Sequence, residues 1–188
     1  MTKARKVHYS LALQIDLLLN HGVKGLYGVE EKLYLRKRKG ESIQHVVMKL
    51  LSYLIYYRED LKIEKAVGQR YKPDLVALDS QGEPEIWIDC GSTSLKKLEA
   101  MVRGNGGTKF IIVKAYPGEL SRYVAQVSTA LREEERLHFL SFGEDLVNQL
   151  GEKLTGRHEI VATLSEEGEK IYVSIDGEGL KGTLLFLS

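Results

Sequence analysis

Residues 72–91, KPDLVALDSQGEPEIWIDCG, contain the pattern that decides the fold. Two apolar stretches, expected as strands over 74–79 and 85–90, flank a segment whose residue types are typical of a tight turn. The pattern predicts an antiparallel hairpin in which Asp74 opens the first strand and Asp89 closes the second. Because a hairpin brings the start of one strand beside the end of the next, we expect these two carboxylates to meet at one edge of the sheet.

The flanking segments alternate between helical and strand patterns. Ser42 can cap a helix over 43–57, in which apolar residues recur at helical spacing, and the nearly continuous apolar stretch 109–115 is typical of a strand buried on both faces. The stretch 7–16 fits a strand or a short helix. Further strands are expected at 31–36, 62–68, 137–142, 159–164, 170–175 and 183–187, and further helices at 93–102, 121–135 and 144–150. This order predicts an α/β protein with a mixed sheet flanked by helices.

The composition is typical of one globular domain, which we expect to span residues 1–188. Of these residues 43% are hydrophobic and 28% are charged, ordinary values for a chain with a sizeable core. No apolar run approaches the roughly 20 residues that span a bilayer, so no membrane partner is expected. The single cysteine, Cys90, excludes an internal disulfide and fits the reducing environment of the cytoplasm.

Charge is distributed unevenly along the chain. Residues 1–40 carry nine Lys and Arg against three Asp and Glu, a balance of +6, whereas residues 119–188 carry seven against thirteen, a balance of −6. The densest basic run is 36–39, with the sequence RKRK. Such a run suits a phosphate backbone, which makes nucleic acid a candidate partner. It also fits a solvated turn or strand end.

Asp74 and Asp89 are the strongest candidates for chemistry. Two carboxylates at one sheet edge repel each other unless a cation lies between them, and carboxylates without Cys or His ligands favour Mg²⁺ or Mn²⁺. Lys96 and Lys97, one helical turn into the next segment, lie within reach to orient water or stabilise negative charge on phosphorus. Alternatively, Asp74 caps a turn, Asp89 forms a structural ion pair, and the two lysines lie on a solvated helix face.

These residues resemble the PD-(D/E)xK nuclease superfamily. Its pattern is Pro-Asp, matched by Pro73 and Asp74, then an acidic residue on the following strand, matched by Asp89, and then a lysine. In most members the lysine follows the second acid at a spacing of two, where this chain has Gly91. Some members carry the lysine on the following helix, and the resemblance then implies that Lys96 or Lys97 takes this role.

The chain also resembles the YaeQ family of small bacterial proteins, a branch of that superfamily. The shared segments are 13–16 (LQID), 48–51 (MKLL), 73–75 (PDL), 85–91 (EIWIDCG), 95–97 (LKK) and a hydrophobic strand that ends at 115–116. The resemblance covers about 7–143. It implies a restriction-endonuclease-like fold with a core at about 41–143, N-terminal strands over 7–36, and an added C-terminal β extension at about 152–188.

The superfamily resemblance also implies a role for Glu41. The first helix of such proteins often supplies a glutamate that completes the metal site, and Glu41 stands at the start of the expected helix. The same glutamate also fits a favourable charge at a helix N-terminus. We therefore expect a metal-dependent nuclease in which Asp74, Asp89 and Glu41 bind Mg²⁺ or Mn²⁺ and Lys97 or Lys96 assists. The alternative is a catalytically inactive module of the same fold that binds nucleic acid or a protein.

Overall fold

The protein is built on one long, curled sheet, described by a computed structural model for residues 10–131 and 134–188. Within these residues the sheet has ten strands in the order β2-β1-β8-β9-β10-β7-β6-β5-β4-β3. The strands are β1 (Leu11–His21), β2 (Leu26–Lys37), β3 (Lys62–Ile63), β4 (Leu75–Leu78), β5 (Pro84–Cys90), β6 (Lys109–Lys114), β7 (Leu137–Phe142), β8 (Arg157–Leu164), β9 (Lys170–Ile175) and β10 (Glu178–Leu187). The helices are α1 (Ile43–Ile55), α2 (Leu95–Gly104), α3 (Pro117–Ala130) and α4 (Leu146–Lys153), with a short 3-10 helix at Gly22–Lys24.

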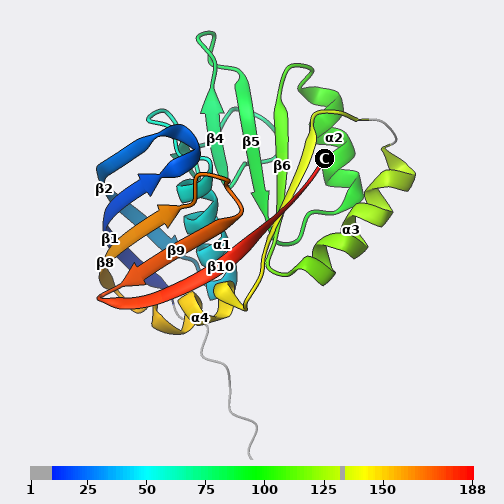
Figure 1. Ribbon diagram of the computed structural model, residues 1–188. Coiled ribbons are helices and arrows are strands. Elements are labelled where there is room, and N and C mark those ends of the chain that lie inside the picture. Colours follow the sequence, from blue (N-terminus) through cyan, green and yellow to red (C-terminus); the bar gives the residue numbers. More distant parts are fainter. Residues whose placement is uncertain (1–9, 132–133) are drawn as a thin grey trace, which may run out of the picture.

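The expected α/β class with a mixed sheet is confirmed. β5, β6 and β7 run parallel to one another, as do β1 and β8, whereas the remaining neighbours are antiparallel. The long strand β10 joins the two halves of the sheet, because its first part pairs with β9 and its last part pairs with β7. Figure 1 shows β10 crossing the front of the molecule between these halves.

The helices divide the interior into two apolar clusters. α1 packs in the curve of the sheet, and its residues from Val46 to Ile55 are all buried. Eight of these ten, all except Lys49 and Ser52, belong to the larger cluster. Burying one Leu or Val side chain stabilises a fold by about 1.5–3 kcal/mol, so this helix is central to stability. α2 and α3 cover the opposite face of β5 and β6, where Trp87 and Phe110 lie in the smaller cluster (Figure 1). Successive residues of β5 therefore face different helices.

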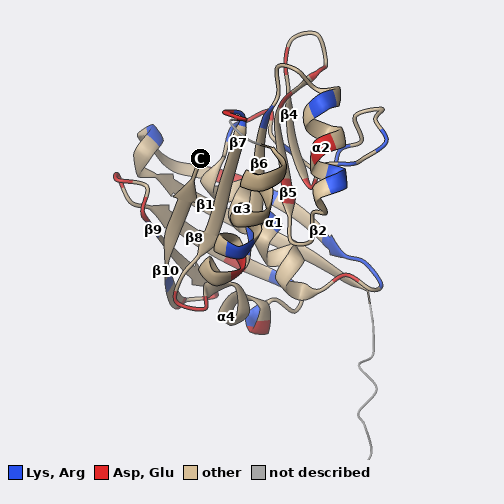
Figure 2. Cartoon of the chain, turned by 90° about the vertical axis from the view of Figure 1, so that its right-hand side faces the viewer, with Lys and Arg blue, Asp and Glu red and all other residues tan. Residues whose placement is uncertain are grey.

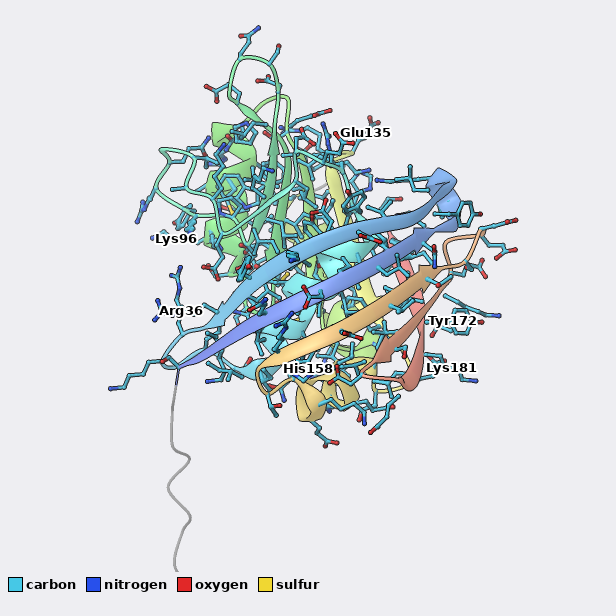
Figure 3. All side chains as sticks on the ribbon, turned by 90° about the vertical axis from the view of Figure 1, so that its left-hand side faces the viewer. Arg36, Lys96, Glu135, His158, Tyr172 and Lys181 are labelled. Atoms are coloured by element: carbon cyan, nitrogen blue, oxygen red, sulfur yellow. The ribbon has the colours of Figure 1, made fainter. Side chains whose placement is uncertain are left out.

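The outer face of β1, β2 and β8 is not covered by any helix that the structure describes, as Figure 3 shows. Its residues alternate with buried ones along β1 and β8 and along the last part of β2, which is typical of a sheet with one solvated face. In the part of the chain that is described, no helix is long and apolar enough to cross a membrane.

The hairpin expected at 74–90 is confirmed. β4 and β5 pair antiparallel with Leu75 opposite Ile88, and Asp79 closes the turn by accepting hydrogen bonds from the backbone N–H groups of Gln81 and Glu83. Ser42 caps α1 as expected, since its hydroxyl accepts a hydrogen bond from the His45 N–H at 3.1 Å.

Several expected boundaries differ from the structure. The first strand is Leu11–His21, and positions 7–9 of the expected strand lie outside the described residues. The strand expected at 62–68 has only two residues. The helix expected from 121 begins at Pro117, because proline is well suited to a first helical turn that needs no N–H donor. The C-terminal strands lie between β1 and β7, so they are integral to the sheet and are not an extension at its margin.

Candidate active site at the end of the β4–β5 hairpin

The hairpin brings Asp74 and Asp89 to the same end of the sheet. Asp74 immediately precedes β4, and its backbone N–H donates to the carbonyl of Ile88 at 3.0 Å. Its carboxylate accepts a hydrogen bond from the N–H of Cys90 at 2.7 Å, directly after Asp89 in the chain. Burial raises the pKa of Asp89, and the negative charge of Asp74 adds to this rise, as expected for two carboxylates that lie near each other.

Asp89 points toward α2 and is almost fully buried, with 2% of its surface exposed. Lys97 Nζ lies 2.8 and 2.7 Å from its two carboxylate oxygens, and the Thr93 hydroxyl donates to Oδ2 at 2.5 Å. Ser94 caps α2 by accepting from the Lys97 N–H, which places Lys97 in the first turn of the helix. Burial raises the pKa of Asp89, although Lys97 and Thr93 oppose the shift.

Asp74 faces α1 and is in a different environment. His45 Nε2 lies 3.1 Å from Asp74 Oδ2, within ion-pair distance but without the alignment of a hydrogen bond. Burial favours the neutral carboxyl, but His45 and the Cys90 N–H outweigh it, so the pKa of Asp74 is lowered. The pKa values of the two aspartates at this end of the hairpin are therefore shifted in opposite directions.

Glu41 lies at the start of α1, where the sequence places it, but it does not meet the aspartates directly. Its Oε1 lies 2.6 Å from Lys49 Nζ and 3.1 Å from His45 Nδ1, and its Oε2 accepts from the Arg38 N–H at 2.7 Å. Because the opposite nitrogen of the same ring faces Asp74, the imidazole of His45 separates Glu41 from Asp74. The structure thus arranges Glu41, His45 and Asp74 in a row.

The two candidate lysines of α2 have different surroundings. Lys97 contacts Asp89, as described above, and its Nζ also lies 5.9 Å from the centroid of the Tyr71 ring. Lys96 is exposed, and none of the hydrogen bonds or ion pairs among the described residues involves it. The structure therefore brings Lys97, and not Lys96, to the carboxylates.

Lys49 and Glu64 belong to the same network, although sequence reasoning did not select them. Lys49 is 1% exposed and contacts Glu41 at 2.6 Å and Glu64 at 2.5 Å. Burial alone would lower the pKa of Lys49, but the two glutamates raise it above its ordinary value. A lysine within the apolar run of α1 was the signal in the sequence, because an unpaired lysine is rarely buried.

Glu64 is also in an uncommon backbone conformation. Its φ of 53° lies in the left-handed region, which residues other than glycine seldom adopt. Its backbone N–H donates to the carbonyl of Asp74 at 2.7 Å, and its carboxylate accepts from Arg38 at 2.6 Å. Such strain persists only where surrounding contacts hold it, and here those contacts are with residues of the candidate site.

A further buried lysine lies on the α2 side. Lys114, at the end of β6, donates to the carbonyl of Gly91 at 2.5 Å and lies 4.1 Å from the centroid of the Tyr123 ring. Burial lowers the pKa of Lys114, and the charges of Glu119 and Asp89 oppose the shift. The strand end that carries Asp89 is thus adjoined by two lysines from other elements.

Gly91 has a conformation that disfavours a lysine at its position. Its φ is +75°, and an L-residue in the left-handed region costs roughly 1–2 kcal/mol. A Cβ there would meet Met48 Cε at an ordinary contact distance of 3.5 Å, so the restriction comes from the backbone and not from crowding. The turn after Asp89 therefore favours glycine.

The donor set fits a divalent cation through two carboxylates. In the described part of the chain, no group of three or more His, Cys, Asp and Glu side chains is arranged to hold a metal ion. Mg²⁺ is usually held by only one or two protein carboxylates, with water or substrate phosphate as the other ligands. A cation beside Asp74 and Asp89 would relieve their mutual repulsion and would have to share Asp89 with Lys97.

The fold is similar to that of two solved structures. The crystal structure of YaeQ protein from Xanthomonas axonopodis pv. citri matches with a TM-score of 0.80 at 14% identity, over 95% of this chain and 98% of that chain. The crystal structure of YaeQ protein from Pseudomonas syringae matches with a TM-score of 0.78 at 16% identity, over 97% of each chain. A comparison with curated proteins found no match.

A sequence model of the family described as YaeQ protein matches residues 10–183. The match extends beyond the region 7–143 on which the resemblance rested, and it includes β8, β9 and most of β10. The C-terminal strands therefore lie largely within the region that the family model matches. The chain belongs to the YaeQ family.

Proposed function

We propose that this protein is a metal-dependent phosphodiesterase that hydrolyses nucleic acid, with a site of the PD-(D/E)xK type. The observation that carries the proposal is the convergence of Asp74, Asp89 and Lys97 at one end of the hairpin, with Lys97 Nζ 2.7 Å from Asp89 Oδ2. The proposal includes a restriction-endonuclease-like arrangement of the sheet and helices, and a cytoplasmic location.

In this proposal Asp74 and Asp89 hold Mg²⁺ or Mn²⁺. The bound cation would polarise the scissile phosphate and lower the pKa of a bound water. Asp74 keeps a charged carboxylate available, because His45 and the Cys90 N–H hold its pKa low. Lys97 stabilises negative charge on the phosphate from the first turn of α2, in place of the lysine that the backbone at Gly91 disfavours.

Glu41 acts as a positioning residue in this proposal. It contacts His45 and Lys49, and it orients the His45 ring, whose other nitrogen faces Asp74. Lys49 contacts both Glu41 and Glu64 and offsets part of their negative charge, so Asp74 and Asp89 are the two carboxylates proposed to hold a cation.

The proposal is tested by cleavage of single-stranded DNA, duplex DNA and RNA in the presence of Mg²⁺ or Mn²⁺. Asp89→Ala should abolish cleavage, and Lys97→Met should reduce it by about 100-fold or more, the usual effect of losing a group that stabilises transition-state charge. Lys181→Met is the control, because it removes an exposed lysine of β10, which is separated from the β4–β5 hairpin by β7 and β6 in the sheet, and it should cleave as the wild type does. Cleavage that survives Asp89→Ala would contradict the assignment.

A second candidate function is a binding module without catalysis. It is favoured by the observation that Glu41, Glu64 and Asp89 each contact a lysine of the chain and Asp74 contacts a histidine, so each of these carboxylates already has a partner within the protein. This function predicts salt-dependent binding of DNA in EDTA together with no calorimetric signal for millimolar Mg²⁺ or Mn²⁺. Metal binding that is lost in Asp89→Ala would exclude it.

A further inference from the structure

Two short segments with basic residues and no acidic ones lie beside the candidate site. The first, residues 36–40, covers the end of β2 and the beginning of its connection to α1, and the second, residues 65–73, is the middle of the connection from β3 to β4. Together with Lys96 of α2, they contribute seven exposed cations, of which Arg36 lies within β2. We call the other six the basic rim: Arg38, Lys39, Lys65, Arg70, Lys72 and Lys96. Lys37 is buried and is not part of this surface.

The second segment is attached to the site at both of its ends. Glu64 and Asp74 flank it, and the N–H of Glu64 donates to the carbonyl of Asp74 at 2.7 Å. Farther along the loop, Gln69 exchanges hydrogen bonds with Asn105 at the end of α2. The loop therefore projects from the strand ends that carry the carboxylates, and it is held against α2.

The first segment contacts Glu64, the residue that precedes the second segment. The Arg38 guanidinium contacts Glu64 at 2.6 Å, and Lys72 Nζ lies 4.0 Å from the same carboxylate. Glu64 thus holds a cation from each segment. Figure 2 shows Lys and Arg on α2, on the neighbouring loop and at the end of β2, all on one side of the molecule.

The loop also combines an aromatic ring with cations. Arg70 Cζ lies 5.4 Å from the centroid of the Tyr71 ring, and Lys97, which contacts Asp89, lies 5.9 Å from that centroid. The Tyr71 ring therefore lies near both Arg70 of the basic rim and Lys97 of the candidate site. Like charges placed together repel one another, and a polyanion whose charges repeat along its length relieves this repulsion.

We propose that the basic rim binds the sugar-phosphate backbone of a polynucleotide and directs it across Asp74 and Asp89. The inference deepens the proposed function, since it names the surface by which a nucleic-acid substrate would be held. Binding and hydrolysis are separate measurements, so either can fail alone.

The test is binding of fluorescein-labelled oligonucleotides to the full chain in EDTA, followed by anisotropy between about 50 and 200 mM salt. The probes are single-stranded DNA, its duplex and RNA of the same sequence. The triple variant R70Q/K72Q/K96Q should bind at least about tenfold more weakly. Its plot of log affinity against log salt should be shallower by about 2, because each lost phosphate contact removes roughly 0.7–0.9 from the slope.

The matched control is the triple variant R122Q/K170Q/K181Q, which removes the same charge from exposed positions on α3, β9 and β10. It should retain the affinity and salt slope of the wild type. Equal losses in both variants would show that only net charge matters and would overturn the inference, as would a wild type that binds anionic lipid vesicles but none of the three probes. Binding through the rim without any cleavage would support the inference and contradict the nuclease proposal alone.

Discussion

Asp89 and Asp74 lie at the same end of the β4–β5 hairpin, yet the first is buried under α2 and the second faces α1. On the α2 side, one carboxylate is adjoined by Lys97 and has a raised pKa, because burial outweighs its partners. On the α1 side, Asp74 has a lowered pKa, because His45 and a backbone N–H outweigh burial.

The difference shows how one hairpin can supply two carboxylates with distinct properties. Environments that move the pKa values of neighbouring acids apart are characteristic of sites in which the acids have separate roles. On the α1 side, two carboxylates share the positive charge of one buried lysine, Lys49. On the α2 side, Asp89 pairs directly with Lys97. Three predictions test this contrast, in order of decreasing effect.

Lys49→Met should cause the largest loss of stability, because Glu41 and Glu64 would then lie close together without the cation between them. Removing one member of a buried ion pair costs about 3–5 kcal/mol, and the partial exposure of Glu64 places the expected loss near the lower value. Urea denaturation at neutral pH measures the free energy of unfolding.

The matched control for Lys49 is Lys72→Met, which removes an exposed lysine 4.0 Å from the same Glu64. Its effect should stay within about 0.5 kcal/mol, as for other surface pairs. If the two variants lost equal stability, the α1 side would not depend on its buried lysine.

Asp74→Asn and Asp89→Asn should respond to pH in opposite directions. The folded pKa of Asp74 is below its unfolded value, so the stability that its charge contributes is present above the unfolded pKa and is lost as pH falls through the folded pKa. The folded pKa of Asp89 is raised, so wild type should gain stability relative to Asp89→Asn as pH falls through that pKa. Each unit of pKa shift corresponds to about 1.4 kcal/mol.

The measurement for this pair is the free energy of unfolding of wild type and both variants from neutral pH to about pH 3. Each variant serves as the control for the other, since both replace an aspartate by its neutral isostere. Parallel curves for the two variants would remove the contrast between the two sides of the hairpin.

Gly91→Ala should have the smallest effect, a loss of about 1 kcal/mol from placing an L-residue at positive φ. Gly104→Ala is the control, because no atom lies within 4 Å of its added Cβ and its φ is outside the left-handed region. Thermal unfolding of both variants measures the difference. A neutral Gly91→Ala would mean that the backbone does not explain the missing lysine at this position.

Local patterns in the sequence predicted the hairpin, its turn and the Ser42 cap, and the structure contains all three. The position of Glu41, the expected third metal ligand, relative to Asp74 could not be predicted in this way. The sequence places Glu41 at the start of α1, but the ring of His45, four residues later, stands between it and Asp74. This arrangement depends on how the side chains of α1 point toward the start of β4, and the spacing of residues along α1 alone does not reveal that direction.

The sequence by itself determined that Asp74 and Asp89 lie together, because hairpin geometry is set by residues close in the chain. The sequence also limited the candidates for the assisting lysine to two, Lys96 and Lys97, in one turn of a helix. Only the tertiary structure placed Lys97, and not Lys96, in contact with Asp89, and only it placed Lys49, Glu64 and Lys114 near the hairpin end. The physical reason is that burial and charge pairing depend on segments distant in sequence, here α1, β3 and β6, that pack around the hairpin end.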